Sequence, residues 1–171
     1  PKKTIYELSK LLSEFDNDIH ISISSNKIVF IIGDIIFISK LIDGSFPDYK
    51  RVIPNNNNNI LKINRDKLLS AVDRVSTIAN EKSPVIKFKL FHNVLNLNTI
   101  NNESSTASED LNIIYDGDEI EIGFNSKYIM DIVNNLEDDE ISINLKDNTS
   151  PVIAKENSNS NLVYVLMPMR V

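Results

Sequence analysis

The run Glu137-Asp138-Asp139-Glu140 is the densest group of side chains in this sequence that could do chemistry. Hard divalent cations prefer carboxylate oxygens, so the run could serve a small metal-dependent hydrolase. The other interpretation is a solvated turn between a helix and a strand. The sequence favours the turn, because no glycine-containing loop and no distant carboxylate motif completes a metal site.

Other catalytic groups are sparse. The chain has two histidines, His20 and His92, no cysteine and only 4 glycines. His20 lies in an alternating strand, out of phase with its isoleucine neighbours, so we expect it to face solvent. His92 falls in a hairpin turn. No Ser/His/Asp grouping and no glycine-rich phosphate loop is evident. We therefore expect a protein that is not an enzyme and that holds neither a metal nor a cofactor.

The 171 residues are 42% hydrophobic and 25% charged, which is typical of a globular protein with one domain, or one domain and part of another. No apolar run has the length of a membrane span, so we expect no membrane partner. The absence of cysteine fits a cytoplasmic location. The first residues, PKKTIYELSK, contain neither an initiator methionine nor a signal peptide, which predicts a piece of a longer gene product.

Hydrophobic periodicity predicts a helix over 4–13, with Thr4 as its N-cap and Glu7 completing a capping box. Three strands with one buried face follow, at 18–24, 27–33 and 34–40. Residues 59–171 predict the order βαββββαβββ. Its helices are expected at 65–79, capped by Asn64, and at 126–136, with a polar loop at 101–110 and a strand at 111–115.

An internal repeat relates the two ends of the chain. A shift of 122 positions places Tyr6 on Tyr128, Ile19 on Ile141 and Ile21 on Ile143. Each copy has a helix, an acidic turn and three strands, which cannot close a core alone. We predict an α+β protein with a complete, internally pseudo-two-fold domain at 55–171. Residues 1–54 are then the second half of a similar domain, with an exposed sheet edge.

Two segments are more apolar and basic than a connector and a chain end usually are. They are LIDGSFPDYKRVIP at 41–54 and YVLMPMRV at 164–171. Together with PKKTIYELSKLL, GDIIFISKLIDG, ANEK at 79–82 and EIGFNSKY at 121–128, they resemble the bacterial DNA polymerase III beta subunits, the sliding clamps. The matches run in family order along essentially the whole chain. The resemblance implies the end of the middle domain and all of the third.

The resemblance implies a DNA-clamp fold, with antiparallel outer sheets and two inner helices per domain. It also implies a processivity factor that, in the full-length protein, forms a head-to-tail homodimer ring around double-stranded DNA without reading its sequence. Without a first domain, this chain is not expected to form that ring. A ring needs few phosphate contacts, which reconciles DNA binding with a net charge of −6. By helix face, the expected DNA-facing residues are Lys10, Lys67, Arg74 and Lys127. The expected subunit interface includes Ile78 and Glu109, the latter in the 103–110 loop.

The resemblance further implies a pocket at the junction of the second and third domains, where peptides of the polymerase, the clamp loader and repair proteins dock. Two buried apolar anchors contribute about 3–6 kcal/mol, and association entropy leaves micromolar, exchangeable binding. Part of the family pocket comes from a segment absent here, so we expect this chain to bind such peptides weakly or not at all. The implied pocket residues are Pro47, Arg51, Val52, Asn125, Tyr128, Thr149, Pro151, Val165, Met167, Pro168, Met169, Arg170 and Val171.

Overall fold

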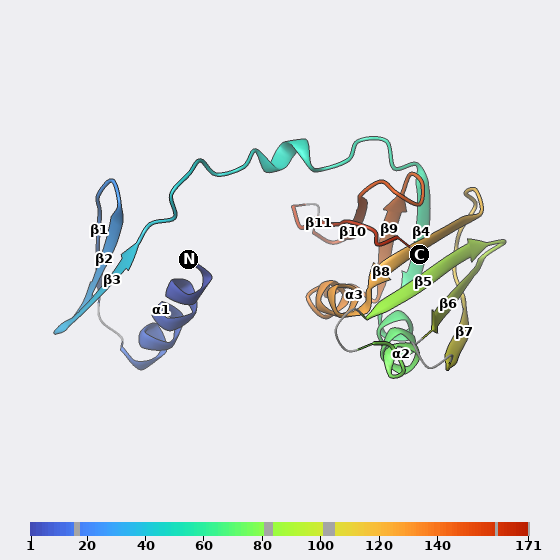
Figure 1. The fold of residues 1–171 in the computed structure, drawn as a ribbon, viewed down its shortest axis with the longest axis horizontal. Helices are drawn as coiled ribbons and strands as arrows, with labels where there is room; N and C mark the ends of the chain where they lie inside the picture. Colours follow the sequence, from blue (N-terminus) through green and yellow to red (C-terminus); the bar gives the residue numbers. More distant parts are fainter. Residues whose placement is uncertain (16–17, 81–83, 101–104, 160, 171) are drawn as a thin grey trace. The chain divides into compact units, whose positions relative to one another are not determined.

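The computed structural model describes residues 1–171 except 16–17, 81–83, 101–104, 160 and 171. The chain divides into two compact units, Pro1–Pro47 and Asp48–Val171, which we call the N-terminal and C-terminal units (Figure 1). No described helix has both the length and the apolar character needed to cross a bilayer.

The N-terminal unit contains one helix and one antiparallel sheet. Helix α1 (Lys2–Glu14) is followed by β1 (Ile19–Ile23), β2 (Lys27–Ile32) and β3 (Ile35–Lys40), in the sheet order β1-β2-β3. All three predicted strands are confirmed. The predicted cap is wrong, because Pro1 occupies the N-cap position and Thr4 lies inside the helix. The Thr4 hydroxyl instead lies 2.6 Å from the Ser39 hydroxyl and joins the helix to β3.

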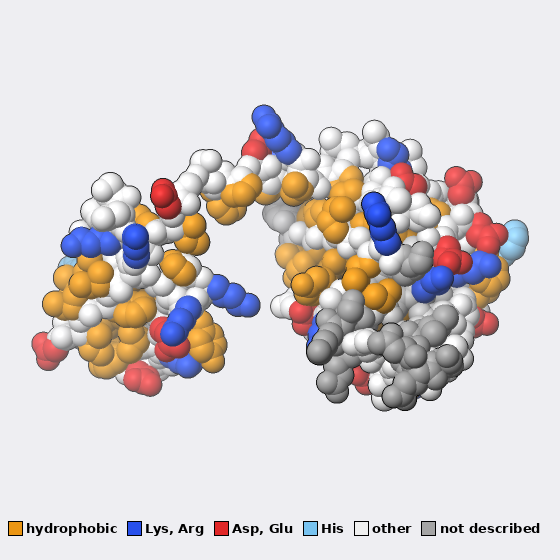
Figure 2. All heavy atoms as spheres, viewed as in Figure 1, with side chains coloured by type: hydrophobic (Ala, Val, Ile, Leu, Met, Phe, Trp, Pro, Cys, Tyr) orange, Lys and Arg blue, Asp and Glu red, His pale blue; other side chains and the backbone are white. Residues whose placement is uncertain are grey.

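The sheet of the N-terminal unit is only partly covered. Phe30 and Ile32 of β2 are buried, but Ile21 and Ile23 of β1 are 57% and 69% exposed. Ile21 lies directly opposite Phe30 and so shares its face. The prediction of one buried face is therefore wrong for β1, since one helix and three strands supply too few apolar partners. Figure 2 shows apolar side chains spread over the visible face of this unit.

The C-terminal unit has the predicted order βαββββαβββ. A short 3-10 helix, η1 (Tyr49–Arg51), precedes it. Its helices and strands are β4 (Asn59–Asn64), α2 (Arg65–Ser76), β5 (Val85–Phe91), β6 (Val94–Ile100), β7 (Thr106–Asn112), β8 (Ile120–Asn125), α3 (Ser126–Asn134), β9 (Glu140–Leu145), β10 (Val152–Glu156) and β11 (Tyr164–Leu166).

The first strand of each half of this unit pairs in the sheet formed by the other half. Their orders are β11-β10-β9-β4 and β7-β6-β5-β8, all antiparallel. Strand β4 precedes α2 yet pairs with β9 of the second half, and β8 precedes α3 yet pairs with β5 of the first half. Each half thus supplies the fourth strand of the other sheet. This exchange explains why a single half cannot close a core.

Both helices begin at an asparagine that ends a strand. The Asn64 side chain accepts a 3.0 Å hydrogen bond from the N–H of Lys67, as predicted. The Asn125 side chain accepts one of 3.0 Å from the N–H of Lys127. An asparagine cap satisfies one of the free amides at a helix start. The same strand–Asn–helix junction in both halves is a local expression of the repeat.

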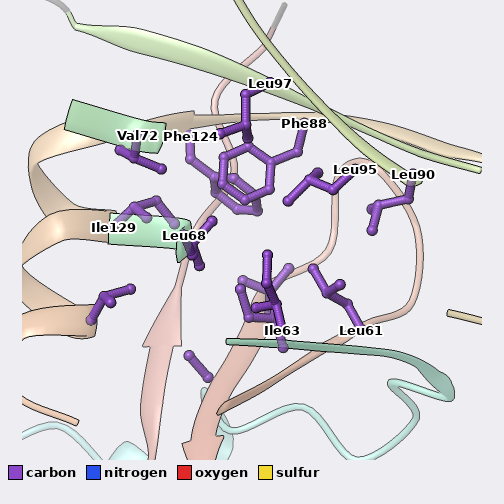
Figure 3. Packing of buried hydrophobic residues seen from close by; sticks show 14 of the residues in the cluster. Leu61, Ile63, Leu68, Val72, Phe88, Leu90, Leu95, Leu97, Phe124 and Ile129 are labelled. Atoms are coloured by element: carbon purple, nitrogen blue, oxygen red, sulfur yellow. The ribbon is translucent and has the colours of Figure 1, made fainter. Parts of the chain in front are cut away.

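The core lies between the helices and the two sheets. Phe88 of β5 and Phe124 of β8 meet edge to face, with ring centroids 5.2 Å apart. Leu68 and Val72 of α2 and Ile129 of α3 are buried in the same cluster (Figure 3). These residues pack the apolar faces of α2 and α3 against the sheets, which positions the α3 surface described below.

Several predictions of element boundaries are wrong. Residues 106–110, predicted as loop, belong to β7, and the strand predicted at 111–115 ends at Asn112. The strand was missed because its alternation is formed by Ala107, Glu109 and Leu111, half-buried residues separated by exposed polar ones. A polar outer face is common on edge strands. Helices α2 and α3 end at Ser76 and Asn134, slightly before their predicted ends.

Candidate functional site

Two pockets in the C-terminal unit share one side chain, Met167, which is 60% exposed. We call the pair the tail groove. Their volumes of about 520 and 440 Å³ are in the range of small-ligand sites. The first pocket is lined by Glu121, Asn148, Thr149, Met167, Pro168, Met169 and Arg170. The second is lined by Tyr128, Asp131, Ile132, Asn135, Tyr164, Val165, Leu166 and Met167.

The C-terminal segment is held to both sheets. In β11, Leu166 pairs with Val152 of β10 and is buried. Beyond β11, the N–H of Met169 donates a 2.8 Å hydrogen bond to the carbonyl of Gly123 in β8, which belongs to the other sheet. Met167 and Pro168 therefore cross from one sheet to the other. Proline at 168 prevents β11 from continuing, because it has no N–H for a ladder.

One wall of the first pocket is the loop between β9 and β10. The Asp147 carboxylate accepts hydrogen bonds from the N–H and hydroxyl of Thr149, at 2.9 and 3.0 Å. It also accepts them from the N–H and hydroxyl of Ser150, at 2.7 and 2.9 Å. These bonds, led by those from the two backbone amides, hold the pKa of Asp147 far below its usual range. The hydrogen bonds to the Asp147 carboxylate thereby close the loop that carries Thr149.

One wall of the second pocket is a face of α3. Tyr128, Asp131, Ile132 and Asn135 follow one another at helical spacing, so they lie on the same side. Among them sequence analysis identified only Tyr128. The i, i+3, i+4, i+7 spacing from Tyr128 is the signal that would have found the other three.

The other groove residues that sequence analysis missed lie on strands and in the 147–150 loop. They are Glu121, Asn148, Tyr164 and Leu166. Glu121 forms a 2.7 Å ion pair with Lys87 on the neighbouring strand, and this contact lowers the pKa of Glu121. The first pocket is therefore lined by an acid whose charge Lys87 compensates and by the basic residue Arg170.

The structure brings together seven of the predicted pocket residues in the tail groove. They are Tyr128, Thr149, Val165, Met167, Pro168, Met169 and Arg170.

Five other predicted residues line neither pocket among the residues described. Asn125 caps α3, and the carbonyl of Pro151 accepts a hydrogen bond from the Asn57 side chain. Arg51 and Val52 are exposed, and Arg51 pairs with Asp48 at 3.3 Å. Pro47 belongs to the N-terminal unit. The remaining predicted residue, Val171, lies outside the described part of the chain.

The residues expected to face DNA are exposed on the three helices. Lys67 and Lys127 lie in the first turns of α2 and α3. The Nζ atom of Lys10 in α1 lies 3.8 Å from Oε1 of Glu7 and 4.2 Å from the centroid of the Tyr6 ring.

Arg74 forms an ion pair that the sequence did not predict. Its Nε and terminal nitrogen donate to the two oxygens of Glu109, at 3.0 and 2.5 Å. This hydrogen-bonded pairing raises the pKa of Arg74 and lowers that of Glu109. An expected DNA contact and an expected interface residue thus contact each other in the same chain. Ile78, the other expected interface residue, is half-buried just beyond α2.

The acidic run at 137–140 is a hydrogen-bonded turn. Asp138 accepts from the N–H groups of Asn157 and Ser158, at 2.8 and 2.9 Å, and its bonds with Ser158 are the main cause of its lowered pKa. The buried Glu156 carboxylate accepts from the N–H of Glu137 at 2.7 Å. Within the described ranges, no three His, Cys, Asp or Glu side chains are grouped to hold a metal ion. The hydrolase hypothesis therefore finds no support.

Comparison with known protein families tests the resemblance to the sliding clamps. The "DNA polymerase III beta subunit, C-terminal domain" family matches residues 50–170, and the corresponding central-domain family matches residues 1–48. The chain belongs to the DNA polymerase III beta subunit family. The resemblance read from the sequence is confirmed.

Relatives of this beta subunit family match the whole chain. The beta sliding clamp of Escherichia coli K12 is 38% identical over 171 residues, which are 47% of its length, and that of Caulobacter vibrioides is 37% identical. The solved Bartonella birtlesii sliding clamp, bound to griselimycin, is 45% identical with a TM-score of 0.89. Caulobacter crescentus pol III beta is 37% identical with a TM-score of 0.90. The predicted clamp fold is confirmed, and the chain spans about half the length of these relatives.

Proposed function

We propose that this chain is part of a sliding clamp, a non-catalytic processivity factor of the bacterial replicative DNA polymerase. Membership of the beta subunit family supports the proposal. The observation that carries it is the tail groove, in which Met167 separates two pockets lined by residues that the family resemblance assigned to peptide docking. In the proposed setting, the cytoplasm, the groove receives peptides of the polymerase, the clamp loader and repair proteins.

The chemistry of the tail groove suits a short peptide with two apolar side chains. Met167 and Met169 can adapt their rotamers to leucine or phenylalanine, since methionine is unbranched and flexible. Arg170 can donate to a peptide carbonyl or carboxylate. Arg51 and Val52 are exposed on the connecting segment, which leaves them accessible to such a ligand. One solved relative carries griselimycin, which makes this compound a suitable probe.

We further propose that residues 1–54 are the second half of a middle clamp domain and that residues 55–171 are the third domain. In the C-terminal unit, β4 supplies the fourth strand to β9. The N-terminal unit has the same helix and three strands without that fourth strand, and Ile21 and Ile23 are exposed on β1. In the longer protein a preceding segment would pair with β1 and cover these side chains.

In the full-length protein, the proposed ring is a head-to-tail homodimer that encircles double-stranded DNA independently of sequence. Lys10, Lys67 and Lys127 would offer it few and exchangeable phosphate contacts, which suits sliding. Arg74 would reach DNA only by weakening its pair with Glu109. Ile78 and Glu109 would lie toward the partner subunit.

The test is isothermal titration of this chain with griselimycin and with a peptide copied from a replicative polymerase tail. We expect saturable binding that Met167→Ala combined with Arg170→Ala abolishes. Lys155→Ala is the matched control, because Lys155 is exposed on β10 and lines neither pocket. Equal binding by the double variant and the control would reject the tail groove as the docking site. Absence of binding by the unaltered chain would reject docking by this chain on its own.

A further inference from the structure

The loop at 147–150 is a wall of the tail groove whose shape depends on one side chain. Asn148 and Thr149 line the first pocket and are exposed, so their own packing does not hold them in place. No strand ladder holds them, because β9 ends at Leu145 and β10 begins at Val152. The hydrogen bonds that Thr149 and Ser150 make to a side chain come from inside the loop.

Asp147 supplies that side chain. One carboxylate oxygen accepts from Thr149 N–H, Thr149 Oγ1 and Ser150 N–H, while the other accepts from Ser150 Oγ. A short side chain that bonds to amides two and three residues ahead closes a turn in the backbone. Bonds to an ionised carboxylate are stronger than those between neutral groups. The depressed pKa of Asp147 agrees with this geometry.

A second contact, from the segment just before β4, fixes the same hairpin. The buried Asn57 amide donates to the carbonyls of Asn144 and Pro151, at 2.9 and 2.8 Å. These carbonyls lie on either side of the 147–150 loop. The base of the hairpin is thus fixed, and Asp147 determines only the conformation of its tip. That division allows the role of Asp147 to be tested without dismantling the sheet.

We propose that Asp147 is a positioning residue of the tail groove, whose carboxylate presets Asn148 and Thr149 in the conformation that receives a peptide ligand. The inference rests on the proposed function and adds a residue to it that does not itself line the groove. A preformed wall spares the ligand the entropy of ordering the loop on binding. Without the carboxylate, two wall residues must be ordered by the ligand, and affinity falls by about tenfold.

The experiment compares griselimycin titrations of the full 171-residue chain and of Asp147→Ala. The matched control is Asp138→Ala, since Asp138 also accepts from two backbone amides but lines neither pocket. We expect about a tenfold larger Kd for Asp147→Ala and an unchanged Kd for Asp138→Ala, with similar losses in Tm. An unchanged Kd in Asp147→Ala, or equal losses in both variants, would overturn the proposal.

Two milder variants resolve the contribution of each oxygen. Ser150→Ala removes only the hydroxyl contact to one oxygen, and Asp147→Asn keeps an acceptor for the amides but loses the charge. Both should fall between the unaltered chain and Asp147→Ala in griselimycin affinity. A weaker affinity in Ser150→Ala than in Asp147→Ala would contradict the positioning role.

A second readout separates this inference from the proposed function. If the unaltered chain binds no griselimycin, docking by this chain fails, and NMR of the ligand-free chain decides the role of Asp147. Faster amide exchange at Thr149 and Ser150, with shifted Met167 and Met169 methyl resonances, would support it if seen in Asp147→Ala and not in Asp138→Ala. Unchanged methyl resonances in Asp147→Ala would overturn it.

Discussion

The backbone N–H of Met169 donates a 2.8 Å hydrogen bond to the carbonyl oxygen of Gly123. This isolated bridge joins the C-terminal segment to β8, after β11 has already paired with β10. The bridge therefore places Met167 between two anchored points and gives the tail groove its central wall.

Replacing Met169 by proline should release the end of the chain. Proline has no N–H, so the bond to Gly123 is lost while Met167 itself is unaltered. We expect griselimycin binding to weaken severalfold and the Met167 methyl resonance to sharpen, with little change in Tm. Met169→Leu keeps the N–H and is the control. Equal affinities for the two variants would show that the bridge does not shape the groove.

The ion pair between Arg74 and Glu109 should contribute little to stability, because both groups are near the surface and solvent screens them. We expect a small coupling in a double-mutant cycle of Arg74→Ala and Glu109→Gln, measured by urea unfolding, and a smaller one in high salt. A coupling that is insensitive to salt would contradict this account.

The same pair sets a pH dependence. The pKa of Glu109 is lowered from its ordinary 4.5 in the folded chain, so the pair stabilises the fold fully above that pH. The stabilisation is lost as pH falls through the lowered folded pKa, because protonation then favours the unfolded state. The stability difference between the unaltered chain and Glu109→Gln should be flat above pH 4.5 and shrink below it. A difference that grows on acidification would refute the assignment.

The edge-to-face contact of Phe88 and Phe124 lies in the fully buried core. Phe88→Ala should destabilise the C-terminal unit by about 3–5 kcal/mol, because it removes a large buried side chain and leaves a cavity. Phe91→Ala, on the same strand but only half-buried, should cost less. Urea unfolding followed by near-ultraviolet circular dichroism measures both. Similar losses would mean that the core relaxes around the missing ring.

Asn57→Ala should destabilise the hairpin beside the tail groove. It deprives the carbonyls of Asn144 and Pro151 of a buried donor, at a cost of about 1–3 kcal/mol. Asn58→Ala is the control, because Asn58 is the exposed neighbour of Asn57. Thermal unfolding of both variants checks the prediction, and an equal Tm for the two would rule out a structural role for the Asn57 amide.

Local patterns in the sequence were sufficient for much of this fold. Alternating apolar residues predicted the strands of both units, and Asn64 marked a helix start that the structure shows. These features depend on residues near one another in the chain. Strand β7 was not fully predicted, because its half-buried positions include Ala107 and Glu109, which give no strong hydrophobic alternation.

The sequence by itself determined the family, the order of elements and the apolar end of the chain that forms the tail groove. Tertiary structure alone decided the exchange of β4 and β8 between halves, since strand pairing is chosen by the burial of both sheets together. It also decided that the Tyr128 face of α3 meets Tyr164 and Val165 in the groove, and that Arg74 meets Glu109. Arg74 and Glu109 lie tens of residues apart in the sequence, and so do the two sides of the groove. No local sequence pattern predicts contacts between such distant positions. Packing of the closed core is what brings them together.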